Sequence, residues 1–188
     1  MSTADEEFLQ GVEAAGWREE LPEDAWQALC ERTKRCVAEG DRPYMGASDY
    51  IFDTEMIDGV GRSERPGELA SYSDLLVFLG ERSYGRFVPE DIVDVFHDDA
   101  QEHEVGFRLG EQTFSTRFAY AGDWLSDAFL DLVTEALEAT GVEQRFQVLP
   151  VVDQAIHGLF LSDAAYERAQ AAGLFPSMDE LIADEMGM

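Results

Sequence analysis

The residues most able to do chemistry form one run that mixes imidazoles with carboxylates, His97-Asp98-Asp99-Ala100-Gln101-Glu102-His103-Glu104. Both groups are common metal ligands, so a cation site is the first chemistry to consider. The spacing matches neither HExxH nor an EF-hand loop, and no cysteine is near. The run therefore predicts no metal site. It favours an acidic loop between two strands, in which Asp98, Asp99, Glu102 and Glu104 belong to a binding surface.

Other catalytic constellations are also missing from the sequence. His157 follows Asp153 on an apolar segment, but no G-x-S-x-G or comparable nucleophile context accompanies the pair. Gly59 and Gly61 lack the third glycine and the lysine of a phosphate-binding loop. We therefore expect a protein that is not an enzyme and that takes no cofactor.

A second charged set has a regular spacing. Asp127, Asp131, Glu135 and Glu138 recur at intervals of four, four and three, which places them on one face of a predicted helix. Segment 126–140 contains no lysine or arginine, although like charges one turn apart destabilise a helix. Two interpretations stay open: a solvated helix face, or a surface kept acidic to receive a basic partner.

Asp123 and Trp124 immediately precede this predicted helix. Trp124 is either a core residue, as tryptophan commonly is, or an aromatic contact within an acidic binding surface. In the second case both residues belong to the same partner-binding set as the helix carboxylates.

The whole chain is strongly acidic, with 40 Asp and Glu against 13 Lys and Arg and a formal net charge of −27. Lys34 is the only lysine. Such a charge repels phosphate, so direct nucleic-acid binding is excluded. The sequence has neither an apolar run of about 20 residues, as a membrane span needs, nor a signal peptide at its start, so we expect a cytoplasmic protein. A basic partner, a saline cytoplasm and simple drift each explain the acidity.

Periodicity and turn residues predict an α+β fold. N-terminal helices are followed by β-β-α-β-β-α, giving a mainly antiparallel sheet with helices packed on one face. We expect a single domain over residues 1–188, with 1–66 as a helical extension packed on a sheet-containing core, 67–188. Cys30 and Cys36 share a predicted helix and are expected to be reduced. Helices are predicted at 4–15, 22–39, 68–82, 126–140 and 162–172 and from 177 onward, and strands at 49–57, 92–96, 105–109, 113–120, 145–149 and 156–161.

Residues 72–174, a little over half of the chain, resemble the cytosolic immunity proteins of bacterial polymorphic toxin systems. The resemblance implies an acidic protein that blocks a toxin by covering its active site, and it supplies no catalytic residues. It lies in Tyr72-Ser73-Asp74-Leu75-Leu76, Gly85-Arg86-Phe87-Val88-Pro89, the strand pair around Phe107 and Phe118, Gly122-Asp123-Trp124 with the helix after it, Gln144-Arg145-Phe146 and Phe160-Leu161-Ser162.

Together these observations predict a non-enzymatic acidic protein that neutralises a basic protein partner, such as a nuclease-type toxin domain. A nuclease site must attract phosphate and is therefore basic, which a carboxylate-rich inhibitor complements. Two alternatives stay open. One is a DNA mimic that occupies a nucleic-acid-binding protein, and the other is a salt-adapted enzyme or ligand-binding protein.

Overall fold

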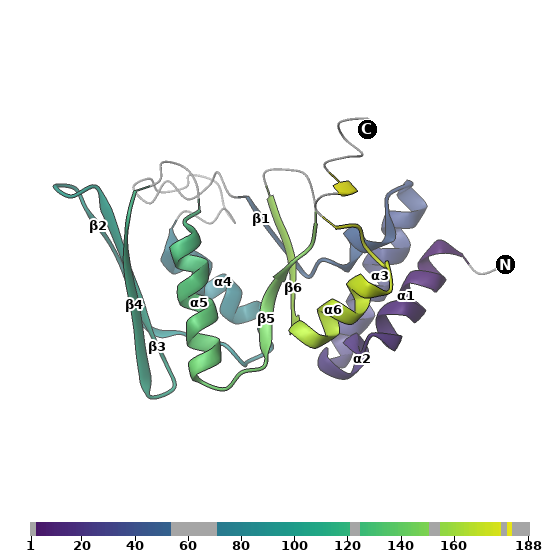
Figure 1. The fold of residues 1–188 in the computed structure, drawn as a ribbon, viewed down its shortest axis with the longest axis horizontal. Coiled ribbons are helices and arrows are strands. Elements are labelled where there is room, and N and C mark those ends of the chain that lie inside the picture. Colours follow the sequence, from purple (N-terminus) through teal and green to yellow (C-terminus); the bar gives the residue numbers. More distant parts are fainter. Residues whose placement is uncertain (1–2, 54–70, 121–124, 151–154, 178–179, 182–188) are drawn as a thin grey trace. The chain divides into compact units, whose positions relative to one another are not determined.

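The computed structural model describes residues 3–53, 71–120, 125–150, 155–177 and 180–181, and it has an α+β fold (Figure 1). The chain forms two compact units. Unit 1 comprises Met1–Ile51 and Gln144–Met188, and unit 2 comprises Phe52–Glu143. These boundaries are not the division at residues 66 and 67 expected from the sequence, and the single-domain organisation stays a prediction.

Unit 1 begins with helices α1 (Ala4–Ala14), α2 (Trp17–Glu20) and α3 (Glu23–Glu39), followed by the 3-10 helix η1 (Pro43–Ala47). Two glycines with left-handed backbone separate or end these helices, Gly16 at φ 94° and Gly40 at φ 92°. Each glycine directly follows a helix predicted from the sequence, 4–15 or 22–39, and a residue without Cβ adopts this conformation at little cost. The helices predicted at 4–15 and 22–39 are therefore confirmed, as α1 and α3.

The rest of unit 1 consists of β5 (Gln144–Val148), β6 (Ala155–Ser162) and α6 (Asp163–Ala171). Strand β6 pairs antiparallel with β5 and also borders β1 (Tyr50–Asp53), so the sheet order is β1-β6-β5. Trp17 is fully buried in this unit and donates its indole N–H to the carbonyl of Ala165 over 3.1 Å. A helix start and a distant helix are thereby fixed to each other through one large apolar side chain.

Unit 2 contains α4 (Tyr72–Arg82), strands β2 (Glu90–His97), β3 (Glu102–Leu109) and β4 (Gln112–Ala119), and α5 (Asp127–Ala139). The three strands form an antiparallel sheet in the order β2-β3-β4. Tyr72 of α4 packs its ring against Phe118 of β4 and Phe129 of α5, with ring centroids 5.2 Å and 5.0 Å away. Helices α4 and α5 therefore share one face of this sheet, whereas the side chains of Val93 and Val95 on the other face are exposed.

The predicted order β-β-α-β-β-α is correct only in part. Three strands, β2, β3 and β4, lie between α4 and α5 where the predicted order has two, and the strands of the described chain belong to two sheets where one was expected. The reason is a long-range pairing: the backbone N–H of Asp49 donates to the carbonyl of Gly158 over 2.8 Å, next to β1 and within β6. This contact assigns the β5–β6 hairpin to the N-terminal helices.

Candidate functional site

The carboxylates predicted to share one face of α5 do so. Asp127, Asp131, Glu135 and Glu138 are all exposed, and we call this set the acidic row. The opposite face of α5 is buried. Burial against the unit 2 core therefore fixes the rotation of α5 and turns the acidic row toward solvent. The buried residues are Phe129, Leu132, Val133, Ala136 and Leu137.

The first turn of α5 is positioned by a side chain from another helix. Ser126 occupies the N-cap position, but its side chain makes no capping hydrogen bond. Its backbone N–H instead donates to the hydroxyl of Tyr72 over 3.3 Å. Tyr72 is almost fully buried, and burial raises the pKa of its hydroxyl. A buried side chain of α4 thus positions the first turn of the acidic helix.

A shallow hollow of about 180 Å³ lies between α5 and β4. Asp131 and Glu135 line it from the helix, and Ser115 and Thr116 line it from the strand. Among the described residues, neither carboxylate has a hydrogen-bond or ion-pair partner. The hollow therefore brings negative charge beside the edge of a β-sheet.

The predicted acidic loop is shorter than expected. Asp98 and Asp99 are exposed in the turn between β2 and β3, but Glu102 and Glu104 lie within β3. The glutamates point to the face of the sheet that α4 and α5 leave uncovered, because side chains alternate along a strand. Glu102 pairs with Arg117 at 2.7 Å and Glu104 with His97 at 2.9 Å. Arg117 therefore offsets the charge of Glu102, and Glu104 is already engaged by His97 of the same sheet.

The two imidazoles of the same run lie on opposite faces of the sheet. His103 pairs with Phe96 and is buried, whereas His97 pairs with Glu102 and lies on the uncovered face. Within the described ranges, no three His, Cys, Asp or Glu residues cluster as they would around a metal ion. Alternation along the strands separates ligands that are adjacent in the sequence.

His103 is held among aromatic rings, and its Nδ1 has no hydrogen-bond partner among the described residues. Burial lowers the pKa of His103, and the charge of Asp94 opposes this shift to a smaller extent. Burial therefore favours the neutral imidazole, which packs as part of the core. The rings around it belong to Tyr72, Phe96, Phe118 and Tyr120.

The remaining sequence candidates fall into three groups. Asp123, Trp124 and Asp153 lie outside the described residues. His157 is buried on β6. Cys30 and Cys36 are free cysteines on α3, and burial raises the pKa of both thiols, which makes them less reactive.

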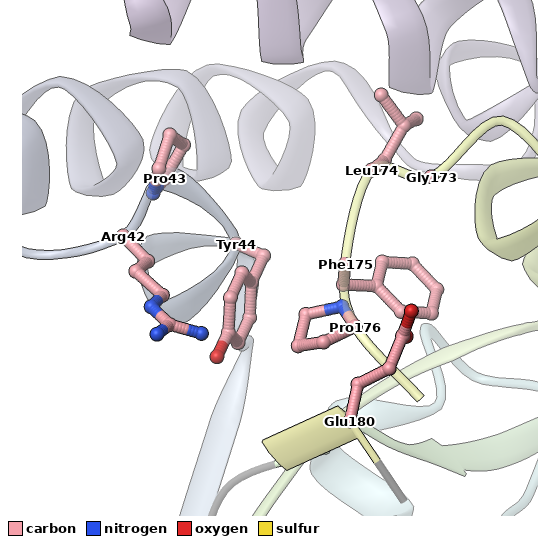
Figure 2. Close-up of a pocket in the computed structure, with 8 residues that line it drawn as sticks. All are labelled: Arg42, Pro43, Tyr44, Gly173, Leu174, Phe175, Pro176 and Glu180. Atoms are coloured by element: carbon pink, nitrogen blue, oxygen red, sulfur yellow. The ribbon is translucent and has the colours of Figure 1, made fainter. Parts of the chain in front are cut away.

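Unit 1 holds a pocket of about 620 Å³ that the sequence did not predict. Figure 2 shows Arg42 and Tyr44 on one side of it, and Phe175, Pro176 and Glu180 on the other. The Glu180 carboxylate is already engaged, since it accepts hydrogen bonds from the backbone N–H and the hydroxyl of Ser177. The proline and aromatic residues around Pro43 and Pro176 are the sequence feature that could have indicated this pocket. The walls combine apolar side chains with the polar groups of Arg42, Tyr44 and Glu180.

Comparisons with protein-family models, with curated proteins and with solved structures found no match to this chain. No helix in the described parts of the chain is long and apolar enough to span a membrane.

Proposed function

We propose that this chain is a non-enzymatic binding protein that uses the acidic row to neutralise a basic protein partner. The partner we propose is a nuclease-type toxin domain, which would make the chain a cytosolic inhibitor of the immunity type. The observation that carries the proposal is the exposed row on α5, a helix of 13 residues with no lysine or arginine.

Electrostatics support this role in two ways. Like charges one turn apart weaken a helix, so folding alone does not favour four acids in a row. A concentrated negative surface also accelerates encounter with a basic partner and pairs with it at contact. The basic phosphate-binding site of a nuclease is a surface of the required sign and strength.

The arrangement of the carboxylates supports an inhibitor of a basic protein over a DNA mimic. A mimic needs two lines of carboxylates that follow the two phosphate strands of a duplex. Helix α5 presents one line, and the pairing of Glu102 and Glu104 with Arg117 and His97 weakens a second line on the sheet.

The test is affinity capture from the native host with the intact chain and two variants. In one variant the row is neutralised by Asp131→Asn with Glu135→Gln. In the matched control the same charge is removed from exposed positions of α3 by Glu31→Gln with Glu39→Gln. We expect the intact chain and the control to recover a cationic nuclease and inhibit it. The row variant should bind it about ten-fold or more weakly, and its association should depend less on salt.

Two results would overturn the proposal. One is the recovery of no cationic protein by the intact chain. The other is equal affinity of the row variant and the α3 control. A chain that unfolds at low salt and binds no basic protein would instead support the salt-adapted alternative.

A further inference from the structure

Strand β4 is an edge of the unit 2 sheet, with β3 as its only strand neighbour among the described residues. Leu109 and Gln112 flank a two-residue turn, so hydrogen-bonded and non-hydrogen-bonded pairs alternate from there along the hairpin. The bond from the Tyr120 N–H to the Gln101 carbonyl, 2.8 Å long, fits this alternation. It follows that the backbone N–H and C=O groups of Thr113, Ser115, Arg117 and Ala119 point away from β3.

The two edges of this sheet differ in how open they are to another strand. On β2, the register shifts between Glu90 and Val93, and Asp91 has a left-handed backbone with φ 51°. Such a bulge and the charges around it are common devices that block pairing at a sheet edge. Strand β4 keeps an unbroken register with β3 over eight residues and contains no proline. The edge of β4 is therefore regular enough to pair with another strand.

The open edge of β4 lies beside the acidic row. Ser115 borders the same hollow as Asp131 and Glu135, and Figure 1 shows α5 running alongside β4. Residues four apart on a helix are separated by about 6 Å along its axis. Alternate residues of a strand are separated by about 6.7 Å. The spacing of every second side chain on a strand added to β4 would thus nearly match the spacing of the carboxylates along α5.

We propose that the β4 edge receives an extended cationic segment of the partner as a fourth strand of this sheet. Residues opposite Ser115 bond to the β4 backbone. Residues opposite Thr116 direct Lys or Arg side chains to the helix-bearing face, toward Asp131 and Glu135. This assignment rests on the proposed function, because it describes how the same surface holds its basic partner. A second copy of the chain fits this edge poorly, since unit 2 has 21 acidic residues against 6 basic ones.

The probe is an eight-residue peptide of alternating threonine and lysine in two isomeric forms. In one, every threonine nitrogen is methylated, and in the other, every lysine nitrogen. The two forms carry the same charge and the same number of methyl groups. When the lysine side chains face α5, the backbone N–H groups that point to β4 are those of the threonines. Only the lysine-methylated form keeps these donors. We expect this form to bind about ten-fold or more tightly, because the other loses several backbone hydrogen bonds.

Two variants of the protein complete the test. Ser115→Pro removes an outward-facing N–H without touching the ladder to β3, so it should abolish the difference between the isomers, whereas Ser115→Ala should preserve it. Neutralising Asp131 and Glu135 should weaken the lysine-methylated form.

Equal binding of the two isomers would overturn strand addition, and so would no binding of either. Neither result touches the proposed function, which fails only if the capture experiment yields no cationic partner that depends on the acidic row. A dimer of the chain that Ser115→Pro dissociates would instead assign the edge to a second copy.

Discussion

Two regions of unit 2 use their carboxylates in opposite ways. On the uncovered face of the β2–β4 sheet, acids are matched by cations: Arg117 pairs with Glu102, and Arg108 pairs with both Glu90 and Asp91, each at 2.7 Å. On α5, the acids stand in a row on a helix that has no cation of its own.

The comparison shows that an acidic side chain in the sequence is available to a partner only if the fold does not already pair it. Glu102 and Glu104 were predicted to join the same surface as Asp131 and Glu135, but the sheet supplies them with internal partners. A partner that binds Glu102 must compete with Arg117, whereas a partner that binds Asp131 displaces only water. The acidic row is therefore the surface on which a basic protein gains most.

The largest effect we expect concerns how α5 is held. If its buried face alone fixes the helix, Phe129→Ala should lower the free energy of unfolding by about 3–5 kcal/mol, because a ring that is fully buried would leave a cavity. Thr134→Ala, on the exposed face of the same helix, should leave stability unchanged or slightly raised. Urea unfolding of both variants measures this. Similar losses in both would show that the exposed face also stabilises the helix, and the contrast with the sheet would disappear.

The next largest effect concerns how the stability of this sheet depends on pH. Burial lowers the pKa of His103 in the folded state, so the unfolded chain binds the proton more readily. Stability from this group is therefore complete above the ordinary value of 6.5 and falls as the pH drops below it. The slope should approach about 1.4 kcal/mol per pH unit, the limit for one proton.

Urea unfolding at about pH 7.5 and about pH 5.5, on either side of the histidine range, measures this loss. His103→Phe keeps an aromatic ring in the cluster and should remove most of the loss. His97→Asn is the matched control, because it replaces the partly buried imidazole of the same sheet and leaves His103 in place. If His103→Phe and the unaltered chain lost stability equally, the pH dependence would have to come from other groups.

The helices and the acidic row could be predicted because their signals are local. The apolar spacing of α3 and the glycine at residue 40 predicted a helix over 22–39, and the structure has one over Glu23–Glu39. The interval between Asp127, Asp131 and Glu135 placed them on one face, and burial of the opposite face confirms it.

The sheets could not be predicted in the same way. The contact between Asp49 and Gly158 joins segments far apart in the chain, and no local pattern encodes it. The ion pairs of Glu102 and Glu104 depend on the strand register, since Arg117 is reached diagonally across the β3–β4 pair. The hollow between Ser115 and Asp131 likewise exists only after α5 has packed beside β4.

The smallest effect tests whether the acidic row costs stability. Asp131→Lys places a cation one turn from both Asp127 and Glu135, converting two repulsive spacings into attractive ones. Each such pair stabilises a helix by about 0.2–0.5 kcal/mol at low salt, so the variant should melt slightly higher than the unaltered chain. The same change on the sheet, Glu102→Lys, should destabilise it, because the new lysine faces Arg117 in place of the carboxylate that pairs with it. If Asp131→Lys melted lower, the row would be part of the fold's own stability. A higher melting temperature together with weaker partner binding would mean that the acidic row lowers the stability of α5. Binding, and not folding, would then require the row.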